Sequence, residues 1–393
     1  MRLVERMQSF GTTIFAEMSA LALMTGSVNL GQGFPDTDGP REMLDRAAAG
    51  LHDGLNQYPP GPGMAVLRSA ISAHQQQYYD LAFDPDTEIL VTVGATEAMA
   101  ASVLALCEPG DEVIVFEPYY DCYAAVVALA GGVRVPVPLR PAETGGRFTF
   151  DPDQLRAAVT PRTRLLLLNS PHNPTGTVLT RDELAMVADV CREHDLVAIS
   201  DEVYEHLTYD DNVHIPLATI PGMRERTVTI SSAGKTFNVT GWKIGWLCAT
   251  PELVRAVNTV KQFMTFTHSA PMQVAVAYAL SEQADWVAGL RDSLQSRRDR
   301  LAAGLEAVGL TVSRPQGTYF IQADVRALGL HDGEVFARGL PHDAGVVAIP
   351  TGVFCDTPGV GTPFVRFAFC KRDTVLDEAV ARLTTYAEKR RAG

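Results

Sequence analysis

The sequence predicts an α/β fold, with a mostly parallel central sheet flanked by helices and a smaller α+β domain beside it. Two observations carry this prediction. Short apolar segments rich in Val, Ile and Leu alternate with helical patterns through the middle of the chain, as expected for strands that are buried on both faces and joined by crossover helices. After about residue 280 the alternation gives way to a long charged amphipathic pattern and separate strands, which indicates a second unit.

Five segments carry the strand pattern, and turn residues bound each of them. They are EILVTV (88–93), DEVIVFEP (111–118), RLLLLNSP (164–171), DLVAISDEVY (195–204) and RTVTISSAG (226–234). The segments 96–107 and 180–194 have the helical pattern. In the second, Thr180 followed three residues later by Glu183 is the capping-box signature of a helix start.

The last third of the chain indicates the smaller domain. A charged amphipathic helix is expected over about 281–309, followed by strands at 317–324 and 364–370. We therefore expect a large cofactor-binding domain at 45–280. The N-terminal arm, 1–44, would join 281–393 to form the small domain.

Composition and charge exclude several classes of protein. Of 393 residues, 33 are basic and 46 acidic, so the formal net charge is −13. Without a basic patch, an acidic chain is a poor partner for nucleic acid or an anionic membrane. No window approaches the roughly 18 apolar residues of a membrane span, and the first residues lack the apolar core of a signal peptide. The six cysteines form no C-x-x-C pair, so we expect reduced thiols in a cytoplasmic protein.

Lysine is scarce in this chain. Only five of the 33 basic residues are lysine: Lys235, Lys243, Lys261, Lys371 and Lys389. Chance and codon bias can explain this count. A chemical explanation is that lysine is kept where an amine with an adjustable pKa is needed, which arginine cannot supply.

Polar residues gather at the carboxyl ends of the predicted strands, where ligands bind in sheets of this kind. The turn Gly94-Ala95-Thr96 opens a helix whose free N–H groups form an anion site. The other residues that follow strands are Asn173, Asp201, Tyr204, Ser231, Ser232 and Lys235. Singly, each has an ordinary explanation as a helix cap, a turn residue or part of the core. Their joint placement on successive strand ends favours one binding site.

This set of groups matches the needs of pyridoxal 5′-phosphate. An amine must bond to the aldehyde of this cofactor, and a buried acid must keep its pyridine nitrogen protonated. Lys235 and Asp201 are the candidates for these two roles. Candidates for its phenolate oxygen are Asn173 and Tyr204, and those for its phosphate are Ser232, Lys243 and the amides of Ala95 and Thr96.

The segment SSAGKTFNVTGWKIGW (231–246) resembles the lysine signature of class I aminotransferases of the fold type I pyridoxal-phosphate superfamily. Supporting segments follow in family order over nearly the whole chain: NLGQGFPD (29–36), NQYPPGPG (56–63), VTVGATEA (91–98), EPYYDCY (117–123), NSPHNPTGTV (169–178), SDEVYEHL (200–207) and FVRFAFCK (364–371). The motifs most resemble those of actinobacterial N-succinyldiaminopimelate aminotransferases, and next those of the kynurenine/glutamine transaminase and cysteine-S-conjugate β-lyase group.

The resemblance implies further cofactor contacts. Tyr120 would stack on the cofactor ring and Asn169 would support it. Tyr58 would reach the phosphate of the cofactor in the neighbouring subunit, which implies a homodimer with shared active sites. At position 243 the chain departs from most of the family, which carries arginine there. Because a lysine is still a cation for a phosphate, we interpret Lys243 as a mark of the subgroup.

The resemblance also implies how substrate is held. Arg366 would grip the α-carboxylate of the substrate as a bidentate fork, and Asn173 and the backbone at Gly33 would help to position that carboxylate. A surface charge on a strand is the alternative explanation of Arg366.

The expected activity is transfer of an amino group between an L-amino acid and a 2-oxo acid. The preferred substrates are N-succinyl-LL-diaminopimelate and 2-oxoglutarate, as in lysine biosynthesis. A kynurenine, glutamine or methionine transaminase with side β-lyase activity is the alternative. A DNA-binding regulator with an aminotransferase-like domain is disfavoured because no basic domain precedes Asn29. A nicotinamide-binding enzyme is disfavoured because no G-x-G-x-x-G motif follows a first strand. Candidate pocket-wall residues are Tyr58, Phe34, Phe354 and Tyr319.

Overall fold

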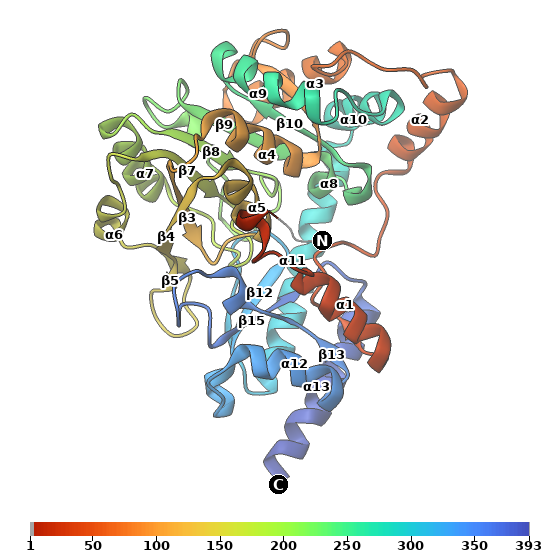
Figure 1. Ribbon diagram of the computed structural model, residues 1–393. Coiled ribbons are helices and arrows are strands. Elements are labelled where there is room, and N and C mark those ends of the chain that lie inside the picture. The colour runs from red at the N-terminus through yellow and green to blue at the C-terminus, as the bar shows by residue number, and fades with distance from the viewer. Residues whose placement is uncertain (1–3, 393) are drawn as a thin grey trace.

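The computed structural model describes residues 4–392 and has a central sheet of seven strands (Figure 1). In spatial order the strands are β2 (Ile89–Val93), β10 (Ile244–Cys248), β9 (Thr227–Ser232), β8 (Val197–Asp201), β7 (Thr163–Asn169), β3 (Glu112–Glu117) and β4 (Val133–Pro138). Every neighbouring pair is parallel except the two that β10 forms with β2 and β9. The mostly parallel sheet is therefore confirmed, with one antiparallel strand that the sequence analysis missed.

Helices cover both faces of this sheet. Successive residues of a strand point to opposite sides, so apolar strands present apolar side chains on both faces. Leu165 and Leu167 of β7 pack with α4, α5 and α9 on one face. Leu166 and Leu168 pack with α6 and α7 on the other, and α2, α3 and α10 cover β2 and β10. These helices are α2 (Arg41–His52), α3 (Ala65–Tyr79), α4 (Gly94–Leu106), α5 (Asp121–Ala130), α6 (Pro152–Ala157), α7 (Arg181–Glu193), α9 (Pro251–Met264) and α10 (Ala270–Glu282). Burial on both faces explains the continuous apolar runs of the strands.

A second, antiparallel sheet forms the core of a smaller α+β unit, drawn in blue in Figure 1. Its strands in order are β11 (Thr311–Ser313), β12 (Phe320–Asp324), β15 (Phe364–Ala368) and β14 (Ile349–Pro350). The helices of this unit are α11 (Ala284–Ala307), α12 (Gly333–Asp343) and α13 (Asp373–Ala392). The domain limits at residues 45 and 280 stay predictions.

The N-terminal segment joins the smaller unit. Strand β1 (Val28–Asn29) pairs in parallel with β13 (Val346–Val347), and α1 (Ile14–Thr25) packs on the same core through Met18 and Ala22. The chain then runs from β1 toward the large sheet. Two further strands, β5 (Arg140–Pro141) and β6 (Phe148–Thr149), form a separate hairpin.

Four strands of the central sheet end earlier than predicted, among them β3 at Glu117 and β7 at Asn169. Strand β8 ends at Asp201, whose Oδ1 accepts a hydrogen bond from the backbone N–H of Val203 at 3.3 Å and turns the chain away from the sheet. Strand β9 ends at Ser232 because the chain winds at once into the short helix α8 (Ala233–Thr236).

The helix predicted over 281–309 is shorter, as the chain breaks at Gln283 between α10 and α11. The capping box is confirmed. Thr180 Oγ1 accepts from Glu183 N, and the Glu183 carboxylate accepts from Thr180 N at 2.8 Å.

No helix within residues 4–392 is long and apolar enough to cross a membrane. All six cysteines are free.

Candidate active site

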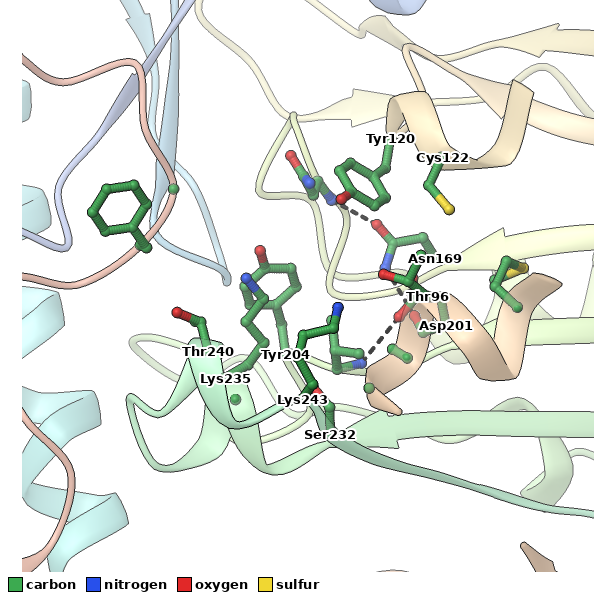
Figure 2. Close-up of a pocket in the computed structure, with 18 of the residues that line it drawn as sticks. Thr96, Tyr120, Cys122, Asn169, Asp201, Tyr204, Ser232, Lys235, Thr240 and Lys243 are labelled. Atoms are coloured by element: carbon green, nitrogen blue, oxygen red, sulfur yellow. Dashed lines mark hydrogen bonds between the residues drawn. The ribbon is translucent and has the colours of Figure 1, made fainter. Parts of the chain in front are cut away.

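A cavity of about 270 Å³ opens at the carboxyl ends of the central strands (Figure 2). Strands β2, β7, β8 and β9 end at Val93, Asn169, Asp201 and Ser232, so the residues that follow them meet at one edge of the sheet. Most of the predicted site residues line this cavity: Gly33, Ala95, Thr96, Tyr120, Asn169, Asn173, Asp201, Tyr204, Ser232, Lys235, Lys243 and Arg366. Tyr58 and Ser231 do not, and the Ser231 hydroxyl donates to Glu205 instead. Their assigned roles stay predictions.

Lys235 lies on α8, directly after β9, and its side chain enters the cavity. Its Nζ donates a hydrogen bond of 2.8 Å to the hydroxyl of Tyr319, which in turn donates to the backbone carbonyl of Gly33 at 2.6 Å. Burial lowers the pKa of the Lys235 amine to about 8, against the attraction of Cys370 and Asp201. Near pH 8 much of this amine is a neutral base with a free lone pair.

Asp201 is a buried carboxyl on the other side of the cavity. The hydroxyl of Tyr123 donates to its Oδ2 at 2.6 Å, and Asn169 Nδ2 donates to its backbone carbonyl at 2.8 Å. Burial raises the pKa of this carboxyl, while the Tyr123 hydrogen bond opposes the rise. In Figure 2, Tyr120 and Asn169 lie across the cavity from Lys235 and Lys243.

One end of the cavity is suited to an anion. Helix α4 begins at Gly94, and its first residues present free N–H groups beside Lys243. Gly94 has φ +71°, and a Cβ there would lie 3.2 Å from Lys243 Nζ. A Cβ on Gly245 would lie 2.5 Å from the carbonyl carbon of Gly94, so both glycines allow β10 to bring Lys243 against the helix N-terminus. Ser232 completes this end.

Arg366 supplies a cation at another wall of the cavity. It lies on β15 and is 1% exposed, so the interpretation as a surface charge is wrong. Its Nη1 donates to Asn173 Oδ1 and its Nη2 to the carbonyl of Gly31, each at 3.0 Å, and the guanidinium stacks 4.0 Å from the ring centroid of Phe320.

The charge of Arg366 has no carboxylate partner within residues 4–392, and its Nε has no hydrogen-bond partner. Burial lowers the pKa of its guanidinium to about 10. A buried cation held only by neutral acceptors is suited to a carboxylate ligand.

Several lining residues were not predicted. Tyr123 was within reach, because it lies one helical turn after Tyr120 in the segment EPYYDCY. Phe15, Gln32, Cys122, Thr240 and Phe320 also line the cavity. Gln32, Cys122 and Thr240 lie within quoted motif segments but were assigned no role, and no sequence pattern marks Phe15 or Phe320.

The predicted wall residues have different positions. Phe34 lines the cavity, whereas Phe354 is buried beneath the Arg366 guanidinium, 5.4 Å away. Tyr319 contacts Lys235 through its hydroxyl. Tyr58 lies in a separate surface hollow, where it is 85% exposed and its ring packs edge-on against Phe266.

The cavity brings together the groups that amino-acid chemistry on a phosphorylated cofactor requires. They are an amine with a lowered pKa, a buried carboxyl, an anion-binding helix start and an unpaired guanidinium. The model of the family described as aminotransferase class I and II matches residues 25–383, and the chain belongs to this family.

Individual relatives match along nearly the whole chain. The probable N-succinyldiaminopimelate aminotransferase DapC of Mycobacterium tuberculosis is 55% identical over 98% of this chain and 99% of that protein. Kynurenine–oxoglutarate transaminase 3 of Mus musculus is 40% identical over 95% of this chain and 88% of that protein.

Two solved aminotransferase structures also match along nearly the whole chain. The structure of N-succinyldiaminopimelate aminotransferase from Mycobacterium tuberculosis matches with a TM-score of 0.96 and 55% identity, covering 98% of this chain and 100% of that one. The structure of YbdL from Escherichia coli, with an identified methionine aminotransferase function, matches with a TM-score of 0.93 and 38% identity, covering 98% and 100%.

The contact between Lys235 and Tyr319 leads to a prediction. In Tyr319→Phe the Lys235 ammonium loses its hydrogen-bond acceptor, which disfavours the charged form, so the pKa of Lys235 falls below about 8. The pH dependence of reductive methylation of Lys235, followed by mass spectrometry in protein freed of bound small molecules, measures this pKa.

Tyr209→Phe is the matched control, because Tyr209 is also buried and also donates to a backbone carbonyl, that of Thr318, but accepts no hydrogen bond from Lys235. A Lys235 pKa that is the same in Tyr319→Phe and in the unmodified protein would contradict the assigned contact.

Proposed function

We propose that the chain is a pyridoxal 5′-phosphate-dependent aminotransferase whose active site is the cavity between Lys235, Asp201 and Arg366. The observation that carries the proposal is the joint placement of the partly buried Lys235 and the buried Asp201 and Arg366 with the anion site at α4. The family match supports it.

The residues present fit this cofactor. Asp201, buried and with a raised pKa, would hold the pyridine nitrogen, and Tyr120 would cover the ring with Asn169 behind it. Asn173 and Tyr204 would contact the phenolate oxygen. The phosphate would lie against the amides of Ala95 and Thr96, Ser232 and Lys243. When bound, the cofactor withdraws electrons from the substrate and so weakens its Cα–H bond.

The remaining steps belong to the side chains of this protein. Arg366 binds the substrate α-carboxylate through its fork of N–H groups, with Asn173 and the backbone at Gly33 beside it. Lys235 then removes the proton from the substrate Cα, a role suited to an amine whose pKa is lowered to about 8. Tyr319 and Gly33 hold the Lys235 amine in the cavity between proton transfers.

For substrates, we favour N-succinyl-LL-diaminopimelate as amino donor with 2-oxoglutarate as acceptor, the reaction of lysine biosynthesis. The 55% identity to the Mycobacterium tuberculosis relative over almost the entire chain supports this choice. The kynurenine and methionine transaminases are 39–40% identical, so their substrates are the second candidates.

We also propose a homodimer with shared active sites. Tyr58 does not reach the cavity of its own chain and is exposed, as expected for a residue that serves a neighbouring subunit. Two further exposed apolar side chains lie beside it, Phe266 against its ring and Leu51 in the same surface hollow, and a partner would cover them. The division into domains at 45–280 and 1–44 with 281–393 is part of this proposal.

Substrate choice can be measured directly. We expect kcat/KM for N-succinyl-LL-diaminopimelate with 2-oxoglutarate to exceed the values for kynurenine and methionine by about tenfold or more. Lys235→Ala should abolish all three reactions while leaving the circular dichroism spectrum unchanged. A higher kcat/KM for kynurenine or methionine would transfer the assignment to the second candidates. Release of pyruvate and ammonia from a cysteine conjugate without any oxo acid would show β-lyase activity.

Tyr58 provides a test of the shared site. In Tyr58→Phe, loss of a hydrogen bond to the cofactor phosphate should weaken pyridoxal phosphate binding by about tenfold or more, since such a bond to a charged group contributes roughly 1.5–3 kcal/mol. Fluorescence titration measures the dissociation constant, with Tyr386→Phe on α13 as the control. Unchanged cofactor affinity in Tyr58→Phe, or a monomer by sedimentation, would rule out the proposed role.

A further inference from the structure

A second cluster of chemically active side chains lies outside the cavity. His74 comes from α3, and Glu205 and His206 come from the turn that follows β8. His74 and Glu205 are each 4% exposed, and His206 is partly buried. One donor atom from each of the three side chains lies within 4.8 Å of the other two. None of the three lines the active-site cavity.

The two imidazoles are arranged like a pair of ligands. His74 Nε2 and His206 Nε2 face each other at 2.7 Å, with the ring planes at 82°. Only one proton can lie between these nitrogens, so at least one of them presents a lone pair to the other. His74 Nδ1 is buried and has no hydrogen-bond partner. Burial lowers the pKa of both rings, that of His206 to about 4, and neutral imidazole is the form that binds metal ions.

The carboxylate of Glu205 adds a negative charge to this cluster. Its hydrogen bonds come from the hydroxyls of Ser231 and Tyr79. Within residues 4–392 no lysine or arginine forms an ion pair with it. The basic groups that act on this carboxylate are His74 and His206 themselves, so a cation bound between the three side chains would pair directly with the buried negative charge.

We propose that His74, Glu205 and His206 form a zinc-binding site. Two imidazole nitrogens and one carboxylate oxygen are donors that Zn²⁺ prefers, and three protein ligands leave one position for water. At Zn–N distances of about 2.0–2.1 Å, two tetrahedral nitrogen ligands stand about 3.3 Å apart, so the imidazoles must separate by about 0.6 Å from their present contact. His206 is the less buried of the two imidazoles and is the one that would move.

The position of the site assigns it a structural role. Glu205 directly follows Tyr204, and its partner Ser231 directly precedes Ser232, both of which line the cavity. A metal bound here would tie α3 to the turn that carries these residues without touching the reacting groups. Zinc should therefore raise thermal stability and leave the chemical step unchanged.

The test is a zinc titration of the full-length enzyme after treatment with a chelator and dialysis. Calorimetry should show one zinc ion per chain, and the melting temperature should rise with zinc. His74→Gln and Glu205→Gln should both lose this binding and the rise in melting temperature. His52→Gln, which removes an exposed imidazole at the end of α2, should retain both.

Absence of stoichiometric zinc binding in the unmodified enzyme, or equal binding in His74→Gln, would overturn the proposal. Should the variants fail to fold, crystals of the unmodified enzyme soaked in zinc show where the metal binds. An anomalous difference peak between His74 and His206 supports the site, and a peak confined to other residues overturns it. None of these measurements uses the cofactor or an amino-acid substrate, so the result is independent of the proposed function.

Discussion

Removal of three ionisable groups from water is the physical constraint on which the active site depends. Lys235, Asp201 and Arg366 all border one cavity, and burial drives each toward its neutral form. Their direct partners are mostly neutral hydroxyls, amides and carbonyls rather than opposite charges. A ligand with an anionic end and a cationic end therefore has stronger electrostatic interactions in this cavity than in water, since charges interact more strongly at low dielectric. The same desolvation makes the lysine available as a base.

The fold supplies these groups from separate parts of the chain. Asp201 and Lys235 come from strand ends of the large sheet, whereas Arg366 comes from the small sheet. Contacts between the parts keep them together: Arg366 bonds to Asn173, and Tyr319 of the smaller unit bonds to Lys235. Any shift of one unit against the other would change the distance between the α-carboxylate site and the base. We infer that the packing of the two units sets the substrate geometry.

Much of the site could be predicted because its residues lie close to strand ends in sequence. Asp201, Ser232 and Lys235 follow apolar runs directly, so the strand pattern alone places them at the edge of the sheet. The start of helix α4 at Gly94, two residues before the predicted start, follows in the same way. The strand β10 was missed because it lies in a segment that was interpreted as a cofactor signature, and its antiparallel pairing has no local marker.

Other features depend on contacts between distant segments, which one sequence does not reveal. Tyr319 meets Lys235 only because β12 packs beside the large sheet, and Phe15 reaches the cavity from α1. The burial of Arg366 follows from the pairing of β15 with both β12 and β14, which the sequence around Arg366 does not reveal. His74 and His206 are 132 positions apart, and neither lies in a metal-ligand spacing pattern.

The absorbance spectrum of the purified protein, recorded before and after adding glutamate, tests the central claim most directly. The account predicts a visible band from pyridoxal phosphate bonded to Lys235, which is absent in Lys235→Ala and which glutamate converts to the spectrum of the aminated cofactor. If no visible band appears even after pyridoxal phosphate is added, the assignment of the cavity as a site for this cofactor is wrong.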